Sequence, residues 1–135
     1  MGEGLAIILS APSGTGKTTI CKVLRKKLPD LKFAVSHTTR PIRKGEKDGV
    51  DSTFIPNEEF EDKIKSNDFL EWAKVHNCYY GTSLQSAETP LKKGYDTLLE
   101  LDIQGVKTLR DMKYQGVYIL IFPPSVKELE ARLKK

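Results

Sequence analysis

This sequence has few cysteines, no long apolar segment and only a small excess of positive charge. The chain contains two cysteines, Cys21 and Cys78, which provide neither a metal-ligand spacing nor a disulfide framework. Because this usage is typical of a reducing compartment, we expect a cytoplasmic protein. The apolar run LAIIL at residues 5–9 is too short for a signal peptide or a membrane-spanning segment. We therefore expect neither export nor a membrane partner.

The charge balance and the length exclude two further classes of protein. A formal net charge of +4 and a pI near 9.0 are modest beside the basic surfaces of nucleic-acid-binding proteins, so we expect no nucleic-acid partner. With 135 residues, 39% of them hydrophobic, the chain suits one compact domain and leaves no room for a second. No residue pattern indicates an oligomeric state.

The most informative motif is APSGTGKT at residues 11–18, between the apolar run and the helical pattern TTICKVLRKKL. Strand, glycine loop and helix form the context of a phosphate-binding loop, in which backbone N–H groups and the positive end of the helix hold a phosphate chain. Lys17 is expected to reach the terminal phosphates and Thr18 to ligate magnesium. One departure from the usual motif is Ala11, where glycine is common. The predicted nucleotide-binding residues are Ala11, Pro12, Ser13, Gly14, Thr15, Gly16, Lys17, Thr18 and Thr19.

Apolar periodicity predicts that strands and helices alternate along the chain. Strands are expected at residues 5–9, 32–36, 96–103 and 117–122, and helices at residues 18–28, from 57 onward, at 83–93 and 104–113, and after a capping box at Ser125 and Glu128. The first helix is expected to cover a sheet with an apolar stripe formed by Ile20, Val23, Leu24 and Leu28. Residues 38–52 are polar and rich in turn formers, which predicts a loop.

Residues 69–82 interrupt this alternation, because FLEWAKVHNCYYGT is typical of a hairpin that turns at His76 and Asn77. We interpret the stretch from 54 to 82 as a small inserted lobe. The remaining elements predict a mostly parallel α/β sheet with helices on both faces and right-handed crossovers. Such folds bind ligands at the carboxyl ends of their strands, which brings residues 15–18, Ser36 and Asp102 around one crevice.

Two features suggest a second anion site and a base-reading carboxylate. Arg40 and Arg43 lie three residues apart in the polar loop, where two guanidinium groups can converge on one phosphate; a solvated basic loop is the alternative. Glu71 alternates with Leu70 and Trp72, which favours a carboxylate that points into a cleft. There it can accept from N1–H and the N2 amine of guanine, whereas adenine leaves it unpaired. A solvent-facing glutamate on an edge strand is the alternative.

After APSGTGKT, the segments SHTTRPIRKGEKDGVD, FLEWAKVHNCYYGT, LELDIQGV and FPPSVKELEARL follow in this order and closely resemble the guanylate kinases. The resemblance covers essentially the whole chain. It implies a P-loop NTPase-type α/β fold in one domain over residues 1–135, with a core at 1–36 and 94–135 and a GMP-binding lobe at about 37–93. It also implies a transferase of purine nucleotide metabolism that uses ATP and Mg²⁺ to phosphorylate GMP or dGMP to the diphosphate.

The same resemblance implies roles for individual residues. Lys17 and Arg132 are the expected catalytic residues. Thr18, and Asp102 through a water molecule, are expected to hold magnesium. The GMP phosphate is expected to contact Ser36, Arg40, Arg43 and Tyr80, and the guanine base Glu71, Thr82 and Asp102, with Thr82 at O6. Glu100 lies on the same strand face as Asp102 and is expected to assist it.

The sequence departs from the family pattern at two places. Ser52 stands where the family usually has a tyrosine that contacts the GMP phosphate, and serine is too short for the same contact. The sequence also stops after ARLKK, where relatives continue into a lid with further arginines, so Arg132 is the one lid arginine present. Because such arginines stabilise the transferring phosphoryl group, we expect slow turnover. Without a further strand beside it, the strand at 117–122 would be an apolar sheet edge, so we expect a chain that is incomplete at its C-terminus.

Three other functions remain open at this level. A guanylate-kinase-like scaffold that has lost catalysis commonly lacks phosphate-loop residues, whereas Gly16, Lys17 and Thr18 are intact here. A GTP-hydrolysing switch usually carries an N-K-x-D string, which this sequence lacks. Another nucleoside monophosphate kinase fits if Glu71 faces solvent.

Overall fold

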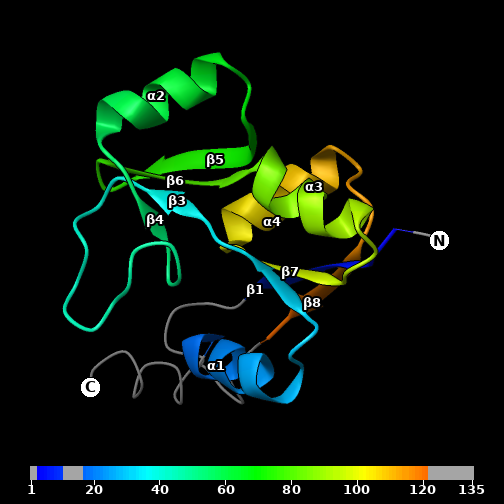
Figure 1. The fold of residues 1–135 in the computed structure, drawn as a ribbon. Helices are drawn as coiled ribbons and strands as arrows, with labels where there is room; N and C mark the ends of the chain where they lie inside the picture. Colours follow the sequence, from blue (N-terminus) through cyan, green and yellow to red (C-terminus); the bar gives the residue numbers. More distant parts are fainter. Residues whose placement is uncertain (1–2, 11–16, 122–135) are drawn as a thin grey trace, which may run out of the picture.

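A computed structural model describes residues 3–10 and 17–121 (Figure 1). Four described strands form the main sheet, in the order β2 (Lys32–Ala34), β7 (Thr97–Glu100), β1 (Ala6–Ser10) and β8 (Val117–Leu120). Each strand runs parallel to its neighbours. The central strands are apolar because both of their faces are covered, and Ile8 and Leu99 have no exposed surface. The predicted parallel sheet is confirmed, with β2 and β7 shorter than expected.

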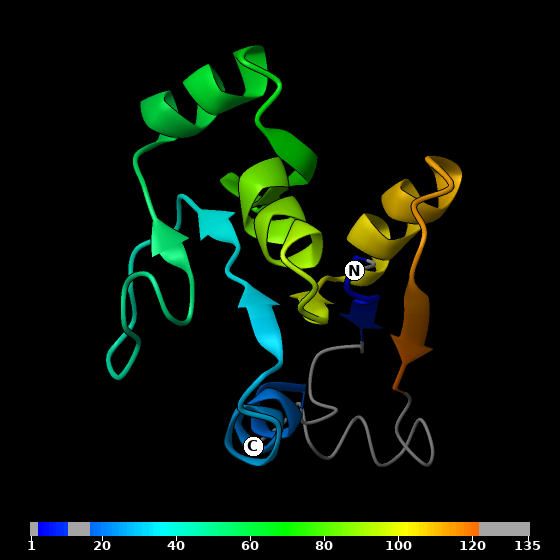
Figure 2. The ribbon, with the colours of Figure 1, turned by 45° about the vertical axis from the view of Figure 1, so that its right-hand side comes forward.

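Helices cover both faces of the main sheet (Figures 1 and 2). They are α1 (Lys17–Lys27) on one face, and α3 (Leu84–Lys92) and α4 (Ile103–Asp111) on the other. Neighbouring residues of β7 point to opposite faces: Leu99 packs in the cluster that contains Leu109 of α4, whereas Leu98 packs with Cys21 of α1. This alternation builds two apolar layers on one sheet, as predicted for an α/β fold.

The predicted apolar stripe of α1 is wrong for two of its four residues. Ile20 and Leu24 pack against the sheet, but Val23 and Leu28 are 44% and 49% exposed. Successive helical residues are about 100° apart, so the face formed by Ile20, Cys21 and Leu24 leaves Val23 at its side. Leu28 lies beyond the last residue of the helix.

A second sheet forms the inserted lobe, in the order β4 (Thr53–Phe54), β3 (His37–Thr38), β6 (Cys78–Ser83) and β5 (Phe69–Val75). The predicted hairpin of β5 and β6 is confirmed, because His76 and Asn77 form its turn with φ angles of 50° and 65°. The sequence did not predict β3 and β4, since two-residue strands have no periodicity to detect.

The lobe has its own aromatic layer beneath α2 (Asn57–Lys65). Phe60 has no exposed surface, and its ring stacks on Phe69 and Tyr79 with centroid distances of 4.3 and 4.8 Å. The helix begins at Asn57 as predicted, although Pro56 is its N-cap and provides no side-chain hydrogen bond.

The lobe and the main sheet share one core, because α3 packs on both. Leu70 of β5 belongs to the same apolar cluster as Ala87 of α3 and Leu99 of β7. The ends of α3 follow the prediction: Ser83 accepts a hydrogen bond from the backbone N–H of Ser86, and Gly94 follows the helix with φ of 90°. None of the helices in the described ranges is long and apolar enough to cross a membrane.

Candidate functional site

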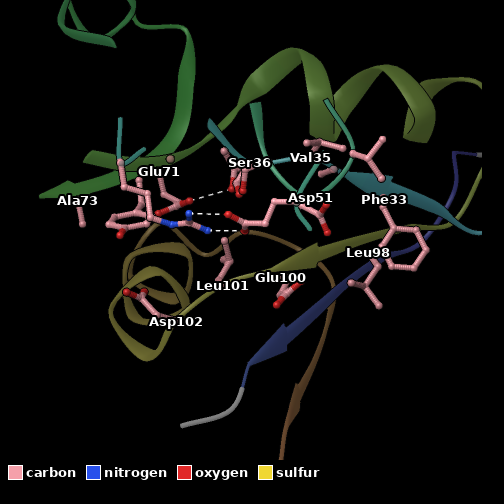
Figure 3. A pocket seen from close by; sticks show the side chains of 18 of the residues that line it. Phe33, Val35, Ser36, Asp51, Glu71, Ala73, Leu98, Glu100, Leu101 and Asp102 are labelled. Carbon is pink, nitrogen blue, oxygen red and sulfur yellow. Dashed lines mark hydrogen bonds and ion pairs between the residues drawn. The ribbon is translucent and has the colours of Figure 1, made fainter. Parts of the chain in front are cut away.

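A cavity of about 420 Å³ lies between the lobe and the carboxyl ends of β2 and β7 (Figure 3). The hairpin of the lobe forms one wall, and the residues that follow β2 and β7 form the other. This position agrees with the general rule for ligand sites in α/β sheets. Six of the predicted GMP-binding residues line the cavity: Ser36, Arg40, Glu71, Tyr80, Thr82 and Asp102.

Glu71 is a buried carboxylate in the cavity wall. It is 8% exposed, whereas its neighbour Trp72 is 44% exposed, so the alternation of β5 turns Glu71 inward and excludes the solvent-facing alternative. The hydroxyl of Thr82, directly opposite on β6, donates to Oε1 of Glu71 at 2.8 Å. Burial raises the pKa of Glu71, and the charge of Asp102 acts in the same direction, while the hydrogen bonds from Thr82 oppose both.

The side chain of Thr82 therefore serves as a hydrogen-bond donor to Glu71 in this structure. Its single hydroxyl proton is donated to the carboxylate, and the residue is 1% exposed. The predicted contact between Thr82 and O6 of guanine stays a prediction, since it requires the hydroxyl to rotate away from Glu71.

Asp102 lies where β7 leads into α4. It is the N-cap of this helix, and its Oδ1 accepts a hydrogen bond of 2.7 Å from the backbone N–H of Gly105. Glu100 lies two residues earlier and lines the same cavity. These carboxylates provide oxygen donors of the type that magnesium prefers. Within the described ranges, no group of three or more histidine, cysteine or acidic residues could hold a metal ion.

Arg40 also lines the cavity, and its guanidinium group is already paired. Its Nη1 and Nη2 atoms donate to Oε1 and Oε2 of Glu46 at 2.8 and 2.7 Å. This bidentate contact lowers the pKa of Glu46 to about 2, together with the backbone N–H of Arg43, which donates to Oε1 at 2.8 Å. The same contact raises the pKa of Arg40.

Arg43 is exposed, and its side chain does not line the cavity. The convergence of Arg40 and Arg43 on a single phosphate therefore stays a prediction. The carboxylate of Glu46 occupies the fork of Arg40, which is the position that a phosphate would take.

The end of β1 adjoins this site. The backbone N–H of Leu101 donates to the carbonyl of Leu9 at 3.0 Å, so the end of β1, where the loop begins, adjoins the end of β7. Lys17 and Thr18 begin α1, which confirms the strand-to-helix context, and Thr19 is exposed. The structure gives no position to the side chains of Lys17 and Thr18. The other predicted residues, Ala11, Pro12, Ser13, Gly14, Thr15, Gly16 and Arg132, lie outside the described ranges, as does the predicted capping box.

Glu46 and Arg25 are among the residues of the cavity wall that sequence reasoning missed. Glu46 carries no motif signal beyond a carboxylate six residues after Arg40, and Gly45 beside it has φ of 89°. Arg25 of α1 lies 4.1 Å above the ring of Phe33, and its Nη2 is 3.5 Å from the carbonyl of Val50. Ser52, which replaces the usual tyrosine, also lines the cavity.

Comparisons with known proteins agree with this arrangement. A family model described as guanylate kinase matches residues 3–135. Over 135 residues the sequence is 49% identical to the guanylate kinase of Clostridium tetani, which covers 100% of this chain and 64% of that protein. Over 133 residues it is 48% identical to the guanylate kinase of Caldanaerobacter subterraneus subsp. tengcongensis, with coverages of 98% and 65%. The chain thus spans less than two thirds of the length of these relatives.

The fold is also similar to a crystal structure of guanylate kinase from Anaplasma phagocytophilum. The TM-score is 0.78 at 36% sequence identity, and the match covers 99% of this chain and 69% of that chain.

Proposed function

Because this chain belongs to the guanylate kinase family, we propose that it transfers the γ-phosphoryl group of ATP to GMP, and to dGMP, to form the diphosphate. One observation carries the proposal. A single cavity is lined both by the buried Glu71 with Asp102, which we call the base end, and by the guanidinium group of Arg40, which we call the phosphate end. A purine monophosphate has the same polarity, with hydrogen-bonding groups on the base and an anion at the far end.

The base end supports guanine as the acceptor base. Glu71 and Asp102 are both acceptors when ionised, and the edge of guanine offers two adjacent donors, N1–H and the N2 amine. Adenine has an acceptor at N1 and no amine at C2, so it would leave Oε2 of the buried Glu71 without a donor from the base, while Oε1 keeps its hydrogen bond from Thr82. Unpaired buried groups discriminate strongly, which supports GMP over AMP.

The phosphate end supports a phosphate ligand. Arg40 presents a planar fork that accommodates carboxylate or phosphate oxygens equally well, and Ser36 and Tyr80 line the same part of the cavity. A bound phosphate would replace Glu46 on this fork, and Arg43 would approach it by a rotation of its exposed side chain. Arg40 then offsets the repulsion between the phosphates of the two substrates.

The transfer itself is proposed as direct. An oxygen of the GMP phosphate forms the new bond to the γ-phosphorus of ATP, the bond from that phosphorus to the bridging oxygen of ADP breaks, and no covalent enzyme intermediate forms. Magnesium would neutralise charge on the ATP phosphates, and it would be held by Thr18 and, through a water molecule, by Asp102, with Glu100 assisting. Lys17 would hold the terminal phosphates, and closure of the lobe would exclude water.

A coupled ADP-release assay with GMP, dGMP, AMP and UMP tests the acceptor, and calorimetry with GMP tests the cavity directly. We expect GMP and dGMP to be preferred over AMP and UMP. Lys17→Ala should abolish turnover and leave GMP binding largely intact, with Lys22→Ala on an exposed part of α1 as the matched control. Equal rates with AMP would overturn the guanine assignment. Stoichiometric binding of both nucleotides without formation of GDP would instead indicate a catalytically silent binding module.

A further inference from the structure

The carboxylates of Glu71 and Asp102 converge on one point of α4, next to Gly105. A Cβ atom on Gly105 would lie 3.2 Å from Oε2 of Glu71 and 3.3 Å from Oδ1 of Asp102. The backbone N–H of Gly105 also donates to this Oδ1 at 2.7 Å. The two acids that face the proposed base therefore share a neighbour that has no side chain.

The backbone of α4 does not explain this glycine. Among the described glycines, Gly45, Gly49 and Gly94 have positive φ angles, and Gly105 does not. It lies inside a helix, where glycine is less favourable than alanine because it loses more conformational freedom on folding. The reason for a residue without a side chain at this position therefore lies in the atoms that surround its Cα.

These neighbours have little freedom to move. Oε1 of Glu71 is held by the hydroxyl of Thr82 at 2.8 Å, and Thr82 is 1% exposed. Oδ1 of Asp102 is held by the same turn of α4, and the Cβ of Leu101, at 3.2 Å from the built Cβ, is fixed by the backbone. These separations are tighter than most contacts of a Cβ atom, so a methyl group at Gly105 requires a neighbour to move by a few tenths of an ångström. Leu101 and Asp102 belong to the same turn of chain, which leaves the carboxylate of Glu71 as the group that shifts.

We propose that Gly105 is a positioning residue for base recognition: its missing side chain leaves the space in which Glu71 and Asp102 present two carboxylates to the same edge of the base. This inference rests on the proposed function and adds a specificity-determining position on α4. Displacement of Glu71 leaves one donor of guanine unpaired, which weakens GMP binding by about 10- to 100-fold.

The test is calorimetry of Gly105→Ala with GMP and with IMP, which lacks the N2 amine, together with thermal unfolding. We expect the 10- to 100-fold loss with GMP and a smaller loss with IMP, and thermal unfolding checks that the variant is folded. Gln104→Ala, an exposed neighbour on the same turn, is the matched control and should bind GMP as the wild type does. A purely structural role would leave the ratio of GMP to IMP affinity unchanged.

A second variant makes the test independent of how well Gly105→Ala folds. Glu71→Asp shortens this side chain by one methylene group, which makes room for the methyl group that Gly105→Ala introduces. The pair Glu71→Asp/Gly105→Ala should therefore fold and bind GMP within about twofold of Glu71→Asp alone.

Wild-type affinity for GMP in Gly105→Ala overturns the inference. So does a double variant Glu71→Asp/Gly105→Ala that does not fold, or one in which Gly105→Ala lowers GMP affinity as much as it does in the wild-type background. Failure of the wild-type protein to bind GMP is a separate result, which overturns the proposed function and this inference with it.

Discussion

At the base end of the cavity, Glu71 is 8% exposed and its partner Thr82 1%, whereas the paired side chains of Arg40 and Glu46 at the phosphate end are 16% and 22% exposed. The base end is held by burial and by a hydrogen bond between two adjacent strands. The phosphate end is held by an ion pair within one loop, which water and salt weaken. The difference is that the packed strands position Glu71 without a ligand, whereas in the proposed function Arg40 must exchange the carboxylate of Glu46 for a phosphate.

The largest expected effect comes from the buried end. Glu71→Gln keeps the size of the side chain but replaces one acceptor with a donor, so it faces the donors of guanine with a donor of its own. We expect GMP affinity to fall by about 100-fold or more, measured by calorimetry. Trp72→Phe, on the exposed face of the same strand, is the control and should bind normally. Similar affinities in the two variants would show that burial does not make the base end selective.

The second effect distinguishes the two ends of the cavity by comparing the affinities for GMP and for guanosine. Arg40→Ala removes the fork that holds the phosphate and leaves Glu46 as an unpaired negative charge beside it. GMP affinity should fall by about 30-fold, while the affinity for guanosine, which has no phosphate, should stay within about twofold of the wild type. An equal loss for both ligands would mean that Arg40 supports the base end as well, and the comparison would fail.

The third effect is a pH dependence confined to the base end. Burial raises the pKa of Glu71 above its ordinary value of 4.5, so this carboxyl takes up a proton at a higher pH than an exposed glutamate. A protonated Glu71 is a poorer acceptor, so guanosine affinity should fall by at most about tenfold per pH unit as the pH is lowered through this pKa. Guanosine is the ligand for this titration because GMP carries a phosphate that itself ionises. In Glu71→Gln the decline should be absent.

The smallest effect concerns the partly buried ion pair between Arg40 and Glu46. The pKa of Glu46 is lowered from 4.5 to about 2, so its contribution to stability is present above pH 4.5 and is lost as the pH falls towards 2. The difference in urea midpoint between the wild type and Glu46→Gln should therefore be small and constant from about pH 8 to about pH 5, and should shrink below that range. A difference that stays constant below about pH 4.5 would show that Arg40 does not stabilise the ionised form of Glu46.

Periodic segments were predictable from the sequence. The hairpin at β5 and β6, the ends of α3 at Ser83 and Gly94, and the inward direction of Glu71 all follow from patterns of a few neighbouring residues, and the structure agrees with each. The strands β3 and β4 could not be predicted in the same way, because two residues carry no periodicity and their pairing depends on partners far along the chain.

Part of the cavity wall was predictable from the sequence, whereas its contacts were not. Ser36, Arg40, Tyr80 and Asp102 do line one cavity. The pairing of Arg40 with Glu46 depends on how the loop around Gly45 turns, and the use of the Thr82 hydroxyl by Glu71 depends on the register between two strands. Such contacts are set by three-dimensional placement, which single-residue patterns do not contain.

Local sequence patterns predicted most of the strands and helices and the chemistry available to them: a glycine loop follows the first strand, and acids and arginines occur at the ends of strands and in a loop. The tertiary structure decided which of these groups meet. Gly105 is the clearest case, since it is an ordinary helical residue in the sequence, and it has a role at the base end only because α4 packs against β5 and brings its Cα against two carboxylates. Local patterns depend on neighbouring residues, whereas a site depends on distances between segments that only packing of the core establishes.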